Sequence, residues 1–250
     1  MLRSILSLLG GLFTFITMGF FGAALTIGAV FWMYGRDLPS HASLAQYKPP
    51  TISRIYSGEG KLIDEFARER RLFTAAEDIP IVIKQAFISA EDKNFYSHPG
   101  YDLRGIVAAA VDAARSRGRN LRGASTITQQ VMKNFLLDGS RRAERKIKEI
   151  ILATRIERTL DKEKILELYL NEIFLGQNSF GVTAAAQTYF NKTLGELAPH
   201  EAAFLASLPK APSDFHPVRR KKRLLQRRNY VLREMWQNGY LDENSFLSEK

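Results

Sequence analysis

The chain has 250 residues, 45% hydrophobic and 25% charged, a balance that excludes a disordered or fibrous protein and allows one or two packed domains. Cysteine is absent, which excludes disulfides, thiolate metal sites and cysteine nucleophiles. The formal net charge of +10 indicates an anionic partner, such as nucleic acid, lipid headgroups or a phosphorylated substrate.

The N-terminal segment has no charged residue between Arg3 and Arg36. As a helix, residues 4–35 would span roughly 48 Å, more than the ~30 Å hydrocarbon core of a bilayer. We therefore predict an uncleaved, single-pass membrane anchor over residues 1–36. A cleaved signal peptide is the alternative, but its apolar region would be only ~7–15 residues long. The positive-inside rule favours a cytoplasmic N-terminus and a body on the extracytoplasmic (periplasmic) side.

Residues 37–72 predict a linker with short extended segments. They hold the pair Pro49-Pro50, the β-favouring run Thr51–Tyr56 and the turn Ser57–Gly60. The pattern after this linker becomes helical, with apolar residues at three- and four-residue spacing.

Residues 73–235 predict one mainly α-helical domain, and residues 236–250 the start of a following region or a C-terminal tail. The basic excess is concentrated in residues 101–160, which carry 13 basic and six acidic side chains, a net +7. Capping residues mark several helix starts. The predicted starts are Asp78-Ile-Pro80, Asp102, the capping box Thr126-x-x-Gln129, Asp161 and Pro199, and a further helix is predicted over residues 140–159.

The first candidate site is the run Glu91-Asp92-x-x-Phe95-x-x-His98 at the end of an apolar helix. Glu91 follows Phe87 by four residues and so lies near the buried face. Partial desolvation there raises the pKa of a carboxyl group and suits it to act as a general base. The alternative is a solvated helix end with surface acids, and a histidine beside it is more often a structural hydrogen-bonding group than a ligand.

The second candidate site is a helix start that follows Gly123. A helix N-terminus presents free N–H groups and the positive end of the helix dipole, so it can bind an anion. The alternative is a capped helix with a polar surface, although two consecutive glutamines are more than a cap requires. The polar residues of this segment are Ser125, Thr126, Gln129, Gln130, Lys133 and Asn134.

The third candidate site is a basic helix face. Arg141, Arg145 and Glu149 are spaced at i, i+4 and i+8, with Lys146 beside them. Two arginines next to one glutamate would hold it ionised, and guanidinium groups can bind a phosphate through paired hydrogen bonds. The alternatives are a solvated basic face and a nucleic-acid site. Aromatic residues do not alternate with the basic ones, which speaks against nucleic acid.

A fourth pattern, Ser207-x-x-Lys210, matches the acylating motif of penicillin-binding transpeptidases. Pro209 disrupts the helix that such a motif needs, and no K-T-G or S-D-N partner motif is present. We therefore predict no transpeptidase active site within these residues.

Together, these segments resemble the peptidoglycan glycosyltransferases of glycosyltransferase family 51. The chain is similar to the N-terminal part of a class A penicillin-binding protein at Tyr47-Lys-Pro-Pro50, Arg54-Ile-Tyr-Ser57 and Arg228-Asn-Tyr-Val-Leu232. A monofunctional transglycosylase is the alternative. The resemblance continues through Lys162-x-x-Ile165-Leu166-x-x-Tyr169-Leu170-Asn171, Phe174-Leu-Gly176, Gly181-Val-x-Ala-Ala, Tyr189-Phe190-x-Lys192 and Leu208-Pro209-Lys210-Ala211-Pro212.

The resemblance implies a lysozyme-like, mainly α-helical domain that polymerises lipid II into β-1,4-linked glycan strands and releases undecaprenyl pyrophosphate. It implies that Glu91 is the catalytic base and that Glu149 positions the neighbouring cations. The cations that would stabilise the leaving pyrophosphate are Lys133, Arg141, Arg145 and Lys146. The residues that would line the substrate site are Asp92, Phe95, His98, Ser125, Thr126, Gln129, Gln130, Asn134 and Asn171.

The partners implied are lipid II, the growing glycan strand, membrane lipids and other cell-wall synthesis proteins, without nucleic acid. The resemblance implies no definite cofactor, and a divalent cation at the pyrophosphate, Mg²⁺ or Mn²⁺, is left open. A membrane-anchored lytic enzyme is the first rival, but it has no use for cations around Glu149. A non-enzymatic scaffold that binds anionic polymers is the second, and it does not need Glu91.

Overall fold

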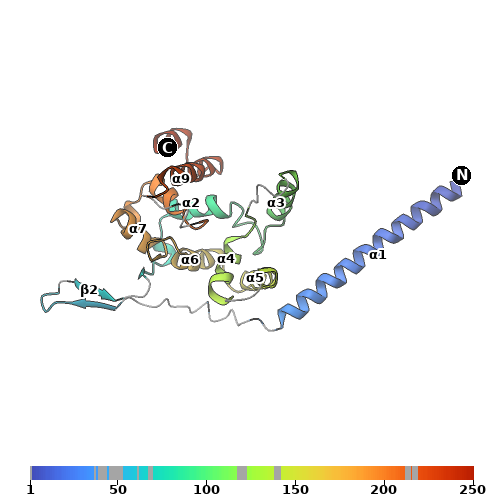
Figure 1. Ribbon diagram of the computed structural model, residues 1–250, viewed down its shortest axis with the longest axis horizontal. Coiled ribbons are helices and arrows are strands. Elements are labelled where there is room, and N and C mark those ends of the chain that lie inside the picture. The colour runs from blue at the N-terminus through green and yellow to red at the C-terminus, as the bar shows by residue number, and fades with distance from the viewer. Residues whose placement is uncertain are drawn as a thin grey trace.

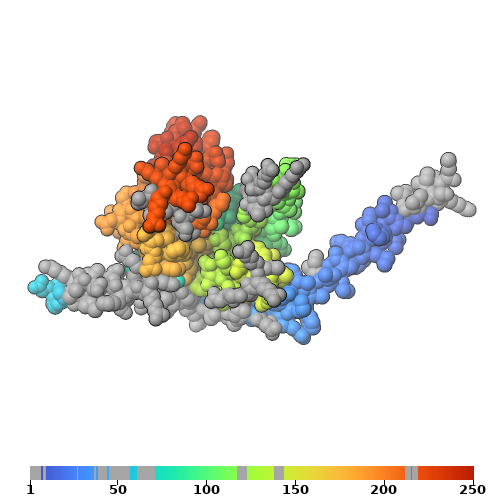
Figure 2. All heavy atoms as spheres, in the orientation of Figure 1, coloured from blue at the N-terminus to red at the C-terminus, as the bar shows by residue number. Residues whose placement is uncertain are grey.

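The computed structural model describes residues 2–36, 38, 44, 53–60, 62–66, 70–116, 123–137, 142–211, 215 and 219–250. Figures 1 and 2 show a helical body from which one long N-terminal helix projects. The mainly α-helical class expected from the sequence is confirmed. Much of the expected linker, including Pro49-Pro50, lies outside the described residues.

Helix α1 (Leu2–Gly35) is the projecting element. Its stretch Gly10–Gly35 is long and apolar enough to cross a membrane, and none of that stretch is buried against the body. The carboxyl end of α1 contacts the body at α5 (Arg142–Ile156), where Arg155 Nη2 donates a hydrogen bond to the Gly35 carbonyl at 3.0 Å. The predicted anchor is therefore tied to the helix that carries the third candidate site.

Two small sheets follow α1. The expected extended segment and turn form a hairpin in which β1 (Ser53–Tyr56) pairs antiparallel with β2 (Leu62–Phe66). The turn between them ends at Gly60, whose φ of 77° lies in the region that glycine adopts without strain. In the second sheet, β3 (Arg70–Arg71) pairs parallel with the short strand β4 (Ser179–Phe180).

The body is built from helices that surround α6 (Figure 1). Packing contacts join α2 to α8 and α9, and α4 to α5 and α6. The helices are α2 (Ile81–Glu91), α3 (Leu103–Arg115), α4 (Ile127–Leu136), α5, α6 (Lys162–Glu172), α7 (Val182–Phe190), α8 (Pro199–Leu205), α9 (Lys221–Gln237) and α10 (Glu243–Glu249).

Three of the predicted caps are confirmed. Asp102 accepts a hydrogen bond from Gly105 N, Thr126 from Gln129 N, and Asp161 from Lys164 N. Each bond satisfies one of the free N–H groups at a helix start. The capping box at Thr126 is only half formed, because the Gln129 side-chain oxygen accepts a hydrogen bond from Lys146 instead.

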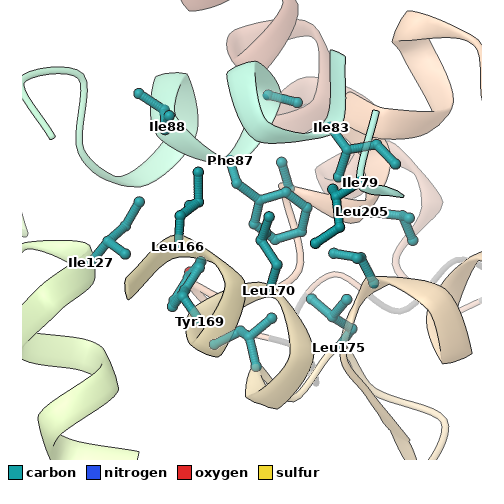
Figure 3. Close-up of a cluster of buried hydrophobic side chains, with 14 of the residues drawn as sticks. Ile79, Ile83, Phe87, Ile88, Ile127, Leu166, Tyr169, Leu170, Leu175 and Leu205 are labelled. Atoms are coloured by element: carbon teal, nitrogen blue, oxygen red, sulfur yellow. The ribbon is translucent and has the colours of Figure 1, made fainter. Parts of the chain in front are cut away.

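The core is centred on α6, in which seven consecutive residues from Ile165 to Asn171 are buried. A helix that is buried on all sides needs partners on every face. Figure 3 shows Phe87 of α2 packed between Leu166 and Leu170 of this helix. The Phe87 and Tyr169 rings meet edge to face with centroids 6.1 Å apart, an arrangement that aromatic pairs favour. Because Phe87 is held in this way, the end of α2 is fixed in place.

Helix α9 was not among the helices predicted from the sequence, and most residues of its first half are basic. Its apolar residues nevertheless repeat at helical spacing and form a buried stripe against α2 and α8. That stripe brings the basic face of α9 next to the end of α2. The buried residues of α9 are Leu224, Val231, Leu232 and Met235.

Candidate active site

A cleft of about 820 Å³ lies between the end of α2, the start of α4, the first half of α5 and one face of α9. It is lined by polar and charged side chains from segments far apart in the chain. The predicted site residues in its lining are Glu91, Asp92, Ser125, Thr126, Gln129, Gln130, Lys133, Arg145, Lys146 and Glu149.

Glu91 is the last residue of α2 and faces this cleft. Its side chain is only 14% exposed. Gln130 Nε2 donates a hydrogen bond to Oε2 at 3.0 Å, and the Nη2 atom of Arg227 lies 3.7 Å from Oε1. Both carboxylate oxygens are therefore oriented by neighbours from α4 and α9.

Burial raises the pKa of Glu91 above its ordinary value, and this effect outweighs all others. The hydrogen bond from Gln130 and the positive charges of Arg227 and Lys210 act in the opposite direction, while Asp92 adds to the rise. A carboxyl group with a raised pKa near a cleft is suited to exchange protons near neutral pH. The proton-accepting group expected from the sequence therefore has the environment that the role requires.

Asp92, by contrast, is tied into a buried network. His98 Nδ1 accepts a hydrogen bond from Gly100 N, so the ring proton lies on Nε2, which donates to Asp92 Oδ2 at 2.9 Å. Ile127 N donates to the same oxygen at 2.9 Å. Asp92 and His98 thus join the end of α2 to the start of α4. These bonds support an architectural role for the pair.

The start of α4 was expected to offer free N–H groups to an anion. In the structure, Ile127 N donates to Asp92 and Gln129 N donates to Thr126. The Thr126 hydroxyl in turn donates to the Gly100 carbonyl at 2.7 Å. These backbone donors are satisfied within the protein, so the positive groups of the cleft come mainly from side chains.

The main cation cluster is centred on Lys146. Its Nζ atom donates hydrogen bonds to Ser125 Oγ at 2.8 Å, Gln129 Oε1 at 2.8 Å and Glu149 Oε2 at 3.1 Å. Arg145 Nε lies 3.4 Å from the other oxygen of Glu149. Glu149 is buried, and these two cations compensate its charge. The cluster confirms that Arg145 and Glu149 share one helix face, as the spacing predicted.

Lys133 is an exposed cation on the same cleft, one turn after Gln129 on α4. No ion pair to a described residue holds its amine, in contrast to Lys146. Asn134 is exposed but does not line the cleft, and Arg141 lies outside the described residues.

Three other predicted site residues do not line the cleft. Phe95 is fully buried in the core, and His98 is buried in the Asp92 network. Asn171 is buried on α6, where its amide group accepts a hydrogen bond from Thr74 N and donates to the Thr74 carbonyl. Asn171 therefore holds the chain that leads into α2.

Several residues of the cleft were not predicted as site residues. Lys210 follows α8, and Arg227, Tyr230 and Glu234 share one face of α9. Lys210 and Arg228-Asn-Tyr-Val-Leu had been noted within the family resemblance, but the local spacing gave no sign that they meet Glu91. Ser207 of the transpeptidase-like pattern is fully buried and donates to the Ala203 carbonyl, so it is no nucleophile in this fold.

No group of three or more Asp, Glu or His side chains that could hold a metal occurs among the described residues. Glu149 is the acidic group closest to the cation cluster, and both of its oxygens face a cation. The residues here therefore do not fit a divalent cation held by the protein alone.

Comparison with known proteins places the chain in a family. Residues 59–236 match the transglycosylase family. Penicillin-binding protein 1A of Rickettsia felis is 51% identical over 218 residues, which cover 86% of this chain and 28% of the relative. Penicillin-binding protein 1A of Neisseria gonorrhoeae is 46% identical over 237 residues, covering 94% and 29%.

A crystal structure of penicillin-binding protein 1A from Haemophilus influenzae is 30% identical and covers 81% of this chain and 20% of that chain, with a TM-score of 0.47. The chain spans less than a third of the length of these relatives. The match over residues 59–236 includes the whole cleft, from Ser89 to Glu234. The chain belongs to the transglycosylase family, and the glycosyltransferase resemblance read from its motifs is confirmed.

Proposed function

We propose that this chain is a peptidoglycan glycosyltransferase that polymerises lipid II into β-1,4-linked glycan strands. The observation that carries the proposal is the joint placement, in one cleft, of a buried carboxyl group with a raised pKa and a cluster of cations on α5. Glycosyl transfer from a lipid pyrophosphate needs one base and a stabilised anionic leaving group. The carboxyl group and the cation cluster match these two needs.

Glu91 is the base in this proposal. The 4-hydroxyl of the acceptor GlcNAc gives its proton to Glu91 as its oxygen attacks C1 of the donor MurNAc. The new C–O bond forms opposite the C1–O bond that breaks, so an α-linked donor becomes a β-linked product. The electron pair of the broken bond leaves with undecaprenyl pyrophosphate.

The leaving group is already anionic, so it needs positive charge and no proton donor. Lys133, Arg145 and Lys146 supply that charge from α4 and α5, and Arg141 adds to it in the proposal. Cations that are fixed in place before the reaction stabilise developing charge without reorganisation at the moment of bond cleavage. Glu149 holds Arg145 and Lys146 in position through contacts of 3.4 and 3.1 Å.

Helix α1 is the membrane anchor in this proposal, with its N-terminus in the cytoplasm and the body on the extracytoplasmic side. Its apolar stretch supports this, as does its contact with α5. A substrate whose polyprenyl tail stays in the bilayer would then meet the cleft at the membrane surface. The growing strand and membrane lipids are the direct partners.

The test is an assay of the full chain, in detergent or vesicles, with labelled lipid II. We expect the wild-type chain to make glycan polymer and Glu91→Gln to make none while keeping its fold. Glu144→Gln is a matched control, because Glu144 pairs with Lys148 on α5 outside the cleft and should leave polymerisation unchanged. Cleavage of preformed glycan without polymerisation would overturn the proposal in favour of a lytic enzyme.

A further inference from the structure

Arg227 makes an unusual set of contacts for a residue of a basic run. Its Nη2 atom lies 3.7 Å from Glu91 Oε1 and donates a hydrogen bond to the Ala90 carbonyl at 3.2 Å. Its guanidinium carbon lies 4.7 Å from the centre of the Tyr230 ring, one turn further along α9. Arg227 therefore fixes both the backbone and the side chain at the end of α2.

The burial of Arg227 disfavours folding, so a stabilising role alone does not explain its position. Its side chain is only 13% exposed, and its Nε–H group is buried without a hydrogen-bond partner among the described residues. A buried donor that lacks a partner disfavours folding, and a buried ion pair is weak evidence for a stabilising role. The next residue of α9, Arg228, avoids this cost, since its Nε and Nη2 atoms donate to Asn229 Oδ1 and Nη2 also donates to the Lys250 carbonyl.

We infer that Arg227 is a positioning residue for Glu91: it aims the carboxylate into the cleft and favours its ionised, proton-accepting form. This inference rests on the proposed function, because it needs Glu91 to be the base. The face of the Tyr230 ring holds the guanidinium in place by a cation–π contact, so the charge stays beside Glu91 when side chains move.

The groups that face Glu91 act in opposite directions. Burial raises its pKa, and Asp92 on the same helix raises it further, while Gln130 of α4, Arg227 of α9 and Lys210 after α8 lower it. The phenol of Tyr169 on α6 is neutral, because burial raises its own pKa well above the ordinary value. Removing Arg227 therefore takes away one of two positive charges, and Glu91 stays protonated up to a higher pH.

The test measures kcat/KM for lipid II polymerisation against pH in the full chain. For Arg227→Met, which keeps the length of the side chain but not its charge, we expect the acidic limb of the profile to move to higher pH. Activity should fall about tenfold or more below neutrality, with a smaller loss at alkaline pH where Glu91 is ionised again. Arg227→Lys, which keeps a positive charge, should restore much of the acidic limb.

Arg233→Met is the matched control. Arg233 lies on the same helix and its guanidinium approaches the same Tyr230 ring, at 5.4 Å, but it is exposed and does not line the cleft. This variant should leave the profile unchanged. A loss of activity in Arg227→Met that is equal at every pH would overturn the inference, since a purely structural contact produces that result. An Arg227→Met variant with wild-type activity and an unchanged pH profile would also overturn the inference. Polymerisation by the wild-type chain would still leave the proposed function intact.

Discussion

Two glutamates of the cleft, Glu91 and Glu149, occupy contrasting environments. Glu91 ends a helix that is packed into the core through Phe87, and its burial outweighs the positive charges near it, so its pKa is raised. Glu149 lies on α5 with Arg145 and Lys146 on its two oxygens. The same residue type thus has a raised pKa in one place and pairs with cations in the other, because its neighbours differ.

The contrast bears on the two needs of the proposed reaction. In that proposal the proton acceptor belongs to α2, which packs on the core through Phe87, whereas the charge cluster on α5 and α4 is joined by hydrogen bonds through Lys146. We expect a conservative change in one group to leave the contacts within the other intact. The predictions that follow test this separation.

The largest expected effect is on turnover in Glu91→Gln. Loss of a positioned general base lowers rates by about 10²–10⁴-fold. Because the cation cluster is untouched, lipid II should still bind with near wild-type affinity. Single-turnover kinetics measure the chemical step, and a separate binding measurement gives the affinity for lipid II. A loss of affinity as large as the loss of rate would contradict the separation.

A smaller loss of turnover is expected when the cation cluster is changed. Arg145→Ala removes a fixed cation, and loss of one such electrostatic contact lowers turnover by about 10²–10³-fold. Polymerisation rates with lipid II check this. Lys148→Ala on the same helix is the control, because Lys148 pairs with Glu144 away from the cleft. If both variants lose the same activity, general disruption of α5 explains the effect instead.

Asp92→Asn should affect stability more than chemistry. Asp92 accepts hydrogen bonds from His98 and from Ile127 N inside the protein, and an asparagine amide cannot accept both with the same strength. Leaving one buried donor unsatisfied costs about 1–3 kcal/mol in the free energy of unfolding. Denaturant unfolding of the detergent-solubilised chain measures this cost. Unchanged stability would mean that the network does not join α2 to α4.

The smallest effect is a gain in stability in Glu91→Gln. The pKa of Glu91 is higher in the folded chain than its ordinary value of 4.5, so the folded state binds its proton more tightly than the unfolded state. The stability that this group contributes is therefore fully present below pH 4.5 and is lost as the pH rises through its pKa in the folded state. Glutamine does not titrate, so the variant should unfold at a higher temperature than the wild-type at pH 8. The difference should close toward pH 4, and a variant less stable at pH 8 would contradict the burial of Glu91.

Features decided within a few residues were predictable from the sequence. The caps at Asp102, Thr126 and Asp161 depend on a side chain and a backbone N–H three residues later, so their spacing in the sequence is enough. The shared face of Arg145 and Glu149 is likewise local to one helix. These local patterns also located ten of the residues that line the cleft.

Pairings between distant segments were not predictable in this way. Arg227 reaches the Ala90 carbonyl across 137 positions of sequence, and only the packing of α9 on α2 brings them together. Asn171 was expected in the substrate site, yet its amide group is used on the backbone of Thr74, 97 positions earlier. A polar residue at a motif position can contact substrate or hold the protein's own backbone, and the groups next to it in the fold decide which.

Lys146 has one further consequence for ligand choice. An ammonium group has three N–H donors, and those of Lys146 are directed at Ser125, Gln129 and Glu149. A ligand that binds Lys146 therefore has to displace one of these oxygen acceptors. Binding is favoured only by the difference in strength between the hydrogen bond to the ligand and the hydrogen bond that is lost. A neutral hydroxyl would gain nothing by replacing Ser125 or Gln129, whereas a charged phosphate oxygen would. The cluster thus discriminates by charge, rejecting uncharged sugars through competition from the protein's own oxygens.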